Sequence, residues 1–337
     1  MKKLSLLFLG LLLVPTLLFT SCDRGDELVD NIVGVTTPKF TLMKEYMVNN
    51  NLDVDKILTN VDGQKFVVGA PASATDVDAF LSGYYIMDIR SSADFLTAHV
   101  KGAINVPFTD ILTDAPKAGI KPILIICYTG QTACYGTALL RMYGYPKTQA
   151  LKWGMSGWNP ATAGSWNNAI NGNPAATSTN WSYNSAPSNV TYNDPKITTL
   201  LTDGNAILKE RVEAIVALGF QGVNGTDVLS NPGNYFINNF FSEGDYSGFG
   251  HINGANRILP FKLADDTYLS LNPDASSLVT YCYTGQTSAV LTATLRVLGY
   301  NGASLKFGMN GLYNSNPVWA SNQWSASVSK NYPTFSN

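Results

Sequence analysis

The sequence predicts an α/β protein built from two repeats of one unit, each a central parallel sheet with helices on both faces. Two observations indicate this fold. The hexapeptide Cys-Tyr-Thr-Gly-Gln-Thr occurs twice, at 127–132 and at 282–287. Around each copy, short apolar runs alternate with stretches of helical spacing, which is typical of a parallel sheet. The chain has 337 residues, enough for two separate cores.

The repeat extends on both sides of the hexapeptide. Upstream, His99-Val-Lys-Gly-Ala matches His251-Ile-Asn-Gly-Ala. Downstream, Leu151-Lys-Trp-Gly-Met-Ser-Gly matches Leu305-Lys-Phe-Gly-Met-Asn-Gly. We therefore expect one order in each unit: a strand, a short helix, the His-x-x-Gly-Ala turn, a strand, the cysteine loop with its helix, and a last strand ending in Gly-Met.

The predicted domain boundaries follow from the repeat. Residues 36–195 form the first domain, and residues 196–337 form the second. The Asn/Ser/Trp-rich segment 159–195 is expected to close the first domain and to link it to the second. Helices at 40–48 and 210–218 are expected to open the two units.

The first 22 residues have the pattern of an export signal. Two lysines precede an apolar run that ends at Phe19 and is short for a membrane-spanning helix. Because Cys22 follows, the segment resembles a bacterial lipoprotein signal peptide, and Cys22 is the expected lipidation site. Residues 23–35 would then be a tether, and the protein would belong to the cell envelope, on a periplasmic or surface face. The alternatives are an ordinary cleaved signal or a single membrane anchor.

Composition excludes some classes of function. The formal net charge is −2, and no Lys/Arg cluster follows the N-terminal pair, so we expect no nucleic-acid partner and no membrane contact beyond the lipid anchor. Without Cys22, three cysteines remain, an odd number that cannot form a complete disulfide framework. Because the chain has two histidines and no Cys-x-x-Cys or His-x-x-x-His spacing, we expect no metal and no other cofactor.

The position of the two cysteines suggests nucleophilic chemistry. Cys127 and Cys282 each follow an apolar run and precede a stretch of helical spacing, so each should lie in a loop at a helix N-terminus. Backbone N–H groups and the helix dipole stabilise an anion there, so we expect the cysteine pKa to fall. The alternative is a buried structural cysteine. Cys134 is expected to be a small core residue, since Ala289 replaces it in the second unit.

The order of the motifs resembles that of the rhodanese family of sulfurtransferases, in a tandem arrangement. Residues 87–90, Met-Asp-Ile-Arg, with Asp94-Phe95, resemble the family's Asp-Val-Arg…Glu-(Phe/Tyr) segment. The segment that begins at His99 resembles its His-Ile-x-Gly-Ala-x-Asn-Ile-Pro turn, and 127–132 fills the six-residue active loop. The resemblance covers about 80–158 and, more loosely, about 233–312. It implies two rhodanese-like domains.

The second unit departs from the family pattern. Where the first unit has Asp88 and Arg90, the second offers Asn238 and Phe240. In the family this acidic–basic pair supports the active loop, so Asp88 and Arg90 are expected to have a structural role. Their loss is expected to leave the second pocket less ordered or differently shaped.

The resemblance implies a sulfurtransferase mechanism with Cys127 and Cys282 as catalytic residues. The thiolate would attack the outer sulfur of a small thiosulfate- or persulfide-type donor, and the resulting cysteine persulfide would pass its sulfur to a thiol acceptor or to cyanide. The residues expected to bind substrate are Tyr128, Thr129, Gly130, Gln131 and Thr132, and Tyr283, Thr284, Gly285, Gln286 and Thr287. Neither loop contains Lys or Arg, which favours a neutral or bulkier donor over free thiosulfate. In the family the histidine of the turn is structural, so His99 and His251 are not expected to act as bases.

Three other interpretations stay open. A cell-division-type cysteine phosphatase would need a Cys-x5-Arg loop, but Ala133 and Ser288 occupy the arginine positions. A non-catalytic binding or scaffold module of the cell envelope is the main alternative, and a redox partner that uses Cys134 is another. If only one loop cysteine turns over, we expect it to be Cys127.

Overall fold

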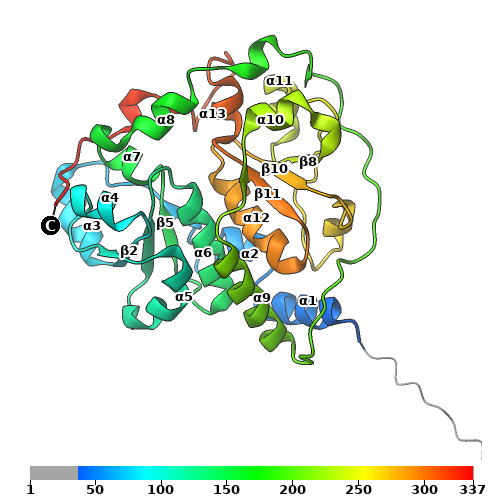
Figure 1. Cartoon of the computed structure of the whole chain (residues 1–337), viewed down its shortest axis with the longest axis horizontal. Helices are drawn as coiled ribbons and strands as arrows, with labels where there is room; N and C mark the ends of the chain where they lie inside the picture. The colour runs from blue at the N-terminus through cyan, green and yellow to red at the C-terminus, as the bar shows by residue number, and fades with distance from the viewer. Residues whose placement is uncertain (1–36, 337) are drawn as a thin grey trace, which may run out of the picture. The chain divides into compact units, whose positions relative to one another are not determined.

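Two parallel sheets form the centre of the protein (Figure 1), and the computed structural model describes residues 37–336. The strand order is β1-β5-β4-β2-β3 in one sheet and β7-β11-β10-β8 in the other. All pairings within both sheets are parallel. We call residues 59–169, around the first sheet, the first half, and residues 204–313, around the second sheet, the second half.

The strands are short, and those at the centre of each sheet are buried. The first sheet contains β1 (Val67–Val68), β2 (Tyr85–Asp88), β3 (Ile104–Asn105), β4 (Ile123–Ile126) and β5 (Gln149–Leu151). The second contains β7 (Gly222–Val223), β8 (Phe236–Asn239), β10 (Leu278–Tyr281) and β11 (Gly302–Leu305). Every residue of β4 and β10 is buried, as is typical of parallel strands covered on both faces. The predicted α/β fold is confirmed.

Helices surround each sheet. Two helices, α1 (Lys39–Asn49) and α2 (Val54–Leu58), precede the first half. The first half has α3 (Val77–Ser82), α4 (Ser92–Thr97), α5 (Ile111–Asp114), α6 (Gln131–Tyr143), α7 (Gly154–Trp158) and α8 (Gly164–Ala169). The second half has α9 (Gly204–Leu218), α10 (Gly225–Ser230), α11 (Glu243–Phe249), α12 (Gln286–Leu298) and α13 (Gly308–Tyr313). The helix predicted at 210–218 therefore begins six residues earlier, where the Asp203 side chain accepts a hydrogen bond from the N–H of Ala206.

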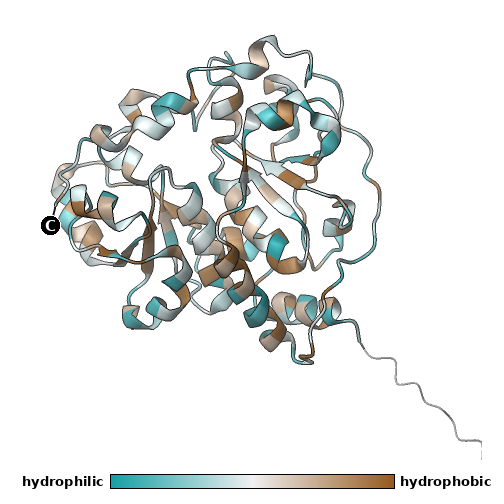
Figure 2. Ribbon diagram, in the orientation of Figure 1, coloured by the Kyte–Doolittle hydropathy of each residue, from teal (hydrophilic) through white to brown (hydrophobic). Residues whose placement is uncertain are grey.

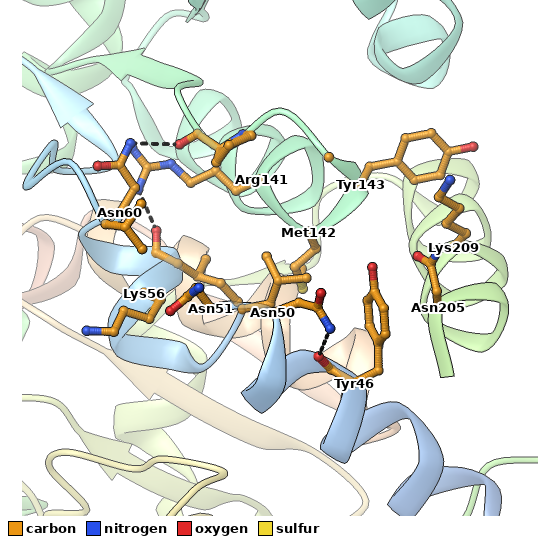
Figure 3. Close-up of a pocket in the computed structure, with 15 residues that line it drawn as sticks. Tyr46, Asn50, Asn51, Lys56, Asn60, Arg141, Met142, Tyr143, Asn205 and Lys209 are labelled. Carbon is orange, nitrogen blue, oxygen red and sulfur yellow. Dashed lines mark hydrogen bonds between the residues drawn. The ribbon is translucent and has the colours of Figure 1, made fainter. Parts of the chain in front are cut away.

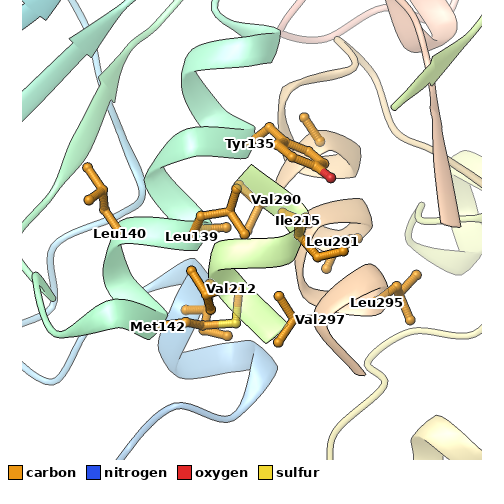
Figure 4. Packing of buried hydrophobic residues seen from close by; sticks show 14 of the residues in the cluster. Tyr135, Leu139, Leu140, Met142, Val212, Ile215, Val290, Leu291, Leu295 and Val297 are labelled. Carbon is orange, nitrogen blue, oxygen red and sulfur yellow. The ribbon is translucent and has the colours of Figure 1, made fainter. Parts of the chain in front are cut away.

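The two helices that follow the cysteine loops, α6 and α12, pack against each other between the halves, and α9 packs against both. Figure 4 shows side chains of the three helices meeting in one apolar cluster, among them Leu139, Val212 and Val290. Almost every residue of α6 and α12 is buried, and Figure 2 shows hydrophobic ribbon where these helices meet. The two halves therefore share one hydrophobic core.

Segments outside the halves pack against the half that is distant in sequence. The Phe40 ring in α1 lies 5.7 Å from the ring of Tyr268. Lys44 donates hydrogen bonds to the Tyr268 hydroxyl (3.1 Å) and to Asp266 (2.5 Å). The Asp53 carboxylate, at the start of α2, accepts the N–H of Leu263 at 2.8 Å. The helix predicted to open the first unit thus packs on the second half.

The segment between the halves and the C-terminal tail also pack against the half that is distant from them in sequence. β6 (Trp181–Ser182) pairs antiparallel with β9 (His251–Ile252) of the second half. The tail returns to the first half, where Tyr332 donates its N–H to the carbonyl of Trp158 at 2.9 Å. We predicted that residues 159–195 close the first domain, but their later part covers the second half because β6 finds its strand partner there.

No helix within residues 37–336 is both long and apolar enough to cross a membrane. The predicted signal peptide, the lipidation site Cys22 and the tether lie outside the described residues. Their assignment stays a prediction.

Candidate active site

The first cysteine loop joins β4 to α6 and directs its sulfur at backbone amides. Cys127 follows the last residue of β4, and its Sγ accepts hydrogen bonds from the N–H groups of Gly130 (3.2 Å) and Ala133 (3.3 Å). Gly130 has φ +83°, a left-handed conformation that glycine adopts without strain. This turn allows α6 to begin at the next residue, so the thiol lies at the N-terminus of a 13-residue helix.

The second loop has a similar geometry with two changes: Cys282 Sγ accepts one backbone N–H where Cys127 Sγ accepts two, and a side-chain hydroxyl lies beside it. Cys282 Sγ accepts the N–H of Ser288 at 3.3 Å, and the thiol also lies 3.6 Å from Ser288 Oγ. Ala133 stands at this position in the first loop, so the hydroxyl is specific to the second. Ser288 Oγ in turn forms a 2.9 Å hydrogen bond with Ser304 Oγ. The sulfur of Cys282 therefore has a side-chain hydroxyl beside it that Cys127 lacks.

The Trp-Gly-Met segment after β5 fixes the backbone of the first loop. Met155 donates its N–H to the carbonyl of Cys127 (2.9 Å), and Ser156 donates its N–H to the carbonyl of Tyr128 (3.0 Å). Gly154 has φ +59°, and a Cβ there would lie 2.3 Å from the Cys127 carbonyl oxygen. Only glycine fits this position.

The corresponding Phe-Gly-Met segment fixes the second loop. Met309 donates its N–H to the carbonyl of Cys282 (2.9 Å), and Asn310 donates to the carbonyl of Tyr283 through its backbone N–H (3.1 Å) and its side chain (2.8 Å). A Cβ on Gly308 would lie 2.1 Å from the Cys282 carbonyl oxygen. Sequence reasoning found this repeated motif but assigned it no role. The repetition of Gly-Met beside each cysteine was the available signal.

Burial raises the pKa of the Cys127 thiol, which is 6% exposed. Amide hydrogen bonds from Ala133, Thr129 and Gly130 lower this pKa but do not offset the lost hydration, and the charge of Asp88 raises it further. The prediction of a lowered cysteine pKa is therefore wrong for Cys127. The loop supplies donors for an anion, but burial favours the neutral thiol.

A buried ion pair supports the first loop. The Arg90 guanidinium donates to the Asp88 carboxylate at 2.9 Å through Nε and 2.6 Å through Nη2, and to the carbonyl of Ala98. It also lies 5.0 Å from the ring centre of Tyr128, whose hydroxyl hydrogen-bonds Asp94. Burial alone would lower the pKa of Arg90, but the hydrogen bonds and charge of Asp88 raise it. Asp88 and Arg90 thus form a buried ion pair beside the first loop, and their role in supporting it stays a prediction.

The counterparts in the second half lie one residue further along than the sequence indicated. We predicted Asn238 and Phe240 at these positions. In the first sheet, Asp88 pairs with Ile126, the residue before Cys127. In the second sheet, the residue before Cys282 is Tyr281, and it pairs with Asn239. The structural counterparts are therefore Asn239 and Phe241.

An aromatic ring replaces the guanidinium in the second half. The Phe241 and Tyr283 rings are stacked, with centres 4.4 Å apart and an interplanar angle of 11°. The Tyr283 hydroxyl donates to the Asp245 carboxylate. Asn239 Nδ2 donates to the Tyr281 hydroxyl at 2.7 Å. The second loop is therefore supported differently, and its support is neutral where that of the first loop is an ion pair.

The two loops lie side by side where the halves meet. Gln131 Oε1 accepts the N–H of Phe307 at 2.7 Å. A Cβ on Gly285 would lie 2.3 Å from Gln131 Oε1, and a Cβ on Gly130 would lie 3.1 Å from Cδ of Gln286. Gln131 was predicted to bind substrate, but its side chain is 97% buried in the contact between the loops. Nothing in the sequence indicated this contact.

The other loop residues predicted to bind substrate differ in exposure. The partly exposed ones are Tyr128, Thr129, Thr132, Tyr283 and Thr287. The buried ones are Gly130, Thr284, Gly285 and Gln286.

An aromatic cluster packs beside the loops. Trp153, Trp166, Phe307 and Trp324 form it, with Trp166 stacked on Trp324 at 5.3 Å. Trp166 Nε1 donates to the carbonyl of Thr129 at 3.1 Å. Trp166 therefore helps to position the first loop.

Both histidines have structural contacts. His99 Nδ1 lies 2.8 Å from the carbonyl of Phe95, and the two rings are stacked at 4.1 Å. His251 stacks on Tyr246 at 3.8 Å, and burial lowers its pKa. The third cysteine of this region, Cys134, is fully buried in α6, where burial raises its pKa well above the ordinary value.

A cavity of about 390 Å³ lies at the opposite end of α6. It is lined by side chains near the C-terminus of that helix, among them Arg141 and Tyr143, and by Tyr46 and Lys209 (Figure 3). A helix of 13 residues is about 20 Å long, so this cavity is remote from both sulfurs. No group of three or more His, Cys, Asp or Glu side chains within residues 37–336 is arranged to bind a metal ion.

One family model and several solved structures match this chain. The family "Rhodanese-like domain" matches residues 73–161 and 240–315. Among solved structures, thiosulfate sulfurtransferase from Pseudomonas aeruginosa is 14% identical with a TM-score of 0.25, and the match covers 90% of this chain and 70% of that one. The 3-mercaptopyruvate sulfurtransferase from Leishmania major is 16% identical with a TM-score of 0.27, with 74% and 75% covered. The two family matches each contain one cysteine loop, and the chain therefore carries two rhodanese-like domains.

Proposed function

We propose that the protein is a sulfurtransferase that carries sulfane sulfur as a cysteine persulfide in its loops. The observation that supports this most directly is the position of the sulfurs. Cys127 Sγ and Cys282 Sγ each lie at the N-terminus of a buried helix and accept backbone N–H groups. A persulfide is acidic and anionic at neutral pH, so these donors would stabilise the intermediate more than the neutral thiol.

The reaction consists of two displacements. The loop thiolate attacks the outer sulfur of a donor such as thiosulfate, a new S–S bond forms, and the old S–S bond breaks with its electron pair leaving on sulfite. The persulfide then gives its outer sulfur to a thiolate or to cyanide, and the loop thiolate is regenerated. The partners are therefore a small sulfur donor and a thiol acceptor.

A phosphatase reaction finds less support. It would need an arginine at Ala133 or Ser288 to bind phosphate in two places. Both residues are instead buried, and their N–H groups bind the cysteine sulfurs.

The second candidate is a non-catalytic binding module, and thiol burial favours it. Cys282 is only 1% exposed, and the neutral state of Cys127 is favoured by burial. If the loops do not open to a donor, both cysteines are structural.

One experiment separates these functions. The full chain is incubated with thiosulfate and then with cyanide, and thiocyanate is measured for wild type, Cys127→Ser, Cys282→Ser and the double variant. A sulfurtransferase gives turnover that is absent in the double variant. Absence of turnover with thiosulfate, mercaptopyruvate and glutathione persulfide would exclude the sulfurtransferase and favour the binding module.

We also propose that Cys22 carries a lipid that anchors the protein in the cell envelope. The resemblance of residues 1–22 to a lipoprotein signal supports this. Expression in a bacterial host with a labelled fatty acid should label wild type and not Cys22→Ser. Equal labelling of the two proteins would refute the anchor.

A further inference from the structure

A cavity of about 440 Å³ lies beside the second cysteine loop, and both halves contribute to it. Thr284, Gln286 and Thr287 of that loop line one part. Lys65 and Lys152, from the first half, line another. Cys282 itself is not among the lining residues, so the cavity adjoins the loop and does not enclose the sulfur.

The two lysines give the cavity a positive charge. Lys152 Nζ donates a hydrogen bond to the Asn322 side chain (3.0 Å). Burial lowers the pKa of Lys152, and the nearby positive charge of Lys65 lowers it further. Within residues 37–336 neither ammonium group lies within salt-bridge distance of a carboxylate. Two neighbouring cations without an acidic partner repel each other, and a bound anion would relieve this repulsion.

The backbone fixes both lysines. The Lys65 carbonyl accepts hydrogen bonds from Arg141 Nη2 (3.1 Å) and from Gln149 Nε2 (2.9 Å). Lys152 directly follows β5 and donates its N–H to the carbonyl of Val68 at 2.8 Å. The two side chains thus start from rigid positions at the edge of the first sheet.

An amide with an unused donor also lies at this cavity. Gln286 is 97% buried and lines this cavity, and its Nε2 has no hydrogen-bond partner within residues 37–336. A buried donor without a partner is rare in folded proteins, so the fold leaves this amide beside the cavity unsatisfied.

The first loop lacks the same pair of charges. Lys306 follows β11 as Lys152 follows β5, so one lysine is repeated. The register of the outer strands places Gly222 at the position of Val67, and counting back two residues places Phe220 at the position of Lys65. The duplication therefore gives two different sites.

We propose that this cavity binds the anionic end, a sulfonate or carboxylate, of the sulfur donor used by the Cys282 loop, and that Lys65 and Lys152 select for that charge. The identity of the ligand as a sulfur donor rests on the proposed function, whereas the anion site does not. This also explains why the loop sequences lack Lys and Arg: the cations come from the other half.

The test uses the full chain with Cys127→Ser and Cys282→Ser, which cannot react, and thiosulfate as the probe in titration calorimetry. We expect saturable binding that weakens as NaCl is raised. Lys65→Gln with Lys152→Gln should weaken binding at least about tenfold, because the variant loses both charges that attract the anion. Lys65→Arg with Lys152→Arg should retain most of the affinity.

Lys306→Gln is the matched control, since it removes the repeated lysine from the other half, and it should leave the affinity unchanged. No thiosulfate binding, or equal loss in Lys306→Gln, would overturn the proposal. Persulfide formation by the reactive chain is measured separately. Binding that depends on Lys65 and Lys152 without any persulfide would refute the sulfurtransferase but keep the anion site. Persulfide formation, together with unchanged thiosulfate binding in the lysine variant, would refute the anion site but keep the sulfurtransferase.

Discussion

The two cysteine loops share a hexapeptide and a fold, but different chemistry supports them. The first loop's tyrosine lies beside Arg90, which is held by buried Asp88. The second loop's tyrosine stacks on Phe241. Loss of the ion pair in one repeat is therefore not loss of support, because a ring occupies the same place beside the tyrosine.

The two loops also differ in what surrounds the sulfur. Cys127 Sγ accepts hydrogen bonds from two backbone N–H groups. Cys282 Sγ accepts one and has the Ser288 hydroxyl nearby. Only the second loop adjoins the cavity lined by Lys65 and Lys152 among the described residues. Duplication has therefore kept the nucleophile and changed the environment that would receive a donor.

The largest expected loss of stability comes from breaking the Asp88–Arg90 ion pair in the first half. Asp88→Ala leaves the Arg90 charge buried and unpaired, and should lower the free energy of unfolding by about 3–5 kcal/mol. Asn239→Ala, its counterpart, removes a neutral hydrogen bond and should cost about 1–2 kcal/mol. Urea unfolding of both variants measures the difference.

Asp88→Leu combined with Arg90→Met is the control for that prediction. It removes both charges and should be much more stable than Asp88→Ala. Equal destabilisation by Asp88→Ala and Asn239→Ala would contradict the distinction between ionic and neutral support.

Substitution of the glycine beside each cysteine loop should have the same effect in both halves. Gly154→Ala and Gly308→Ala place a Cβ 2.3 Å and 2.1 Å from the loop carbonyls at a positive φ. Each should cost more than about 2 kcal/mol through overpacking and backbone strain, and each should reduce the reactivity of its own cysteine. Gly164→Ala, where a Cβ meets nothing within 4 Å, is the matched control and should be nearly neutral in urea unfolding. Neutral behaviour of Gly154→Ala would show that the segment does not fix the loop.

A smaller effect concerns pH. Burial favours the neutral thiol and raises the pKa of Cys127, so its thiolate forms at a higher pH than in a free cysteine. Iodoacetamide alkylation of Cys127, followed by peptide mass spectrometry, should be slow at pH 7 and should still rise above about pH 8.5, the ordinary cysteine pKa. A rate that reaches a plateau below pH 7 would show that the amides outweigh burial.

The smallest effect should come from the tyrosine hydroxyls. Tyr128→Phe and Tyr283→Phe each remove one hydrogen bond, to Asp94 and Asp245 respectively. Each should cost about 0.5–1.5 kcal/mol in urea unfolding and leave the ring contacts in place. A loss as large as that of Asp88→Ala would mean that the hydroxyl, and not the ring, supports the loop.

Much of the architecture could be predicted because it depends on local patterns. Alternation of apolar runs and helical stretches indicated both sheets, and the repeated hexapeptide located both loops. The role of Gly154 and Gly308 was visible as a repeated motif, but the motif alone does not show which carbonyl lies beside each glycine.

What could not be predicted depends on contacts between distant segments. The register of β8 against β10 moved the counterparts of Asp88 and Arg90 by one residue, because strand patterning does not fix pairing. Lys65 and Lys152 reach the second loop only through the packing of the two halves. The raised pKa of Cys127 reflects burial, which a helix N-terminus in the sequence does not indicate.

The most direct test of the central claim is peptide mass spectrometry of Cys127→Ser and Cys282→Ser after incubation with thiosulfate at low and high salt. The account predicts a gain of one sulfur atom on the remaining loop cysteine in each variant, with the persulfide on Cys282 more sensitive to salt because Lys65 and Lys152 attract its donor. The same data test the sequence-based prediction that Cys127 is the cysteine that turns over. Absence of any sulfur gain on both cysteines would contradict the account.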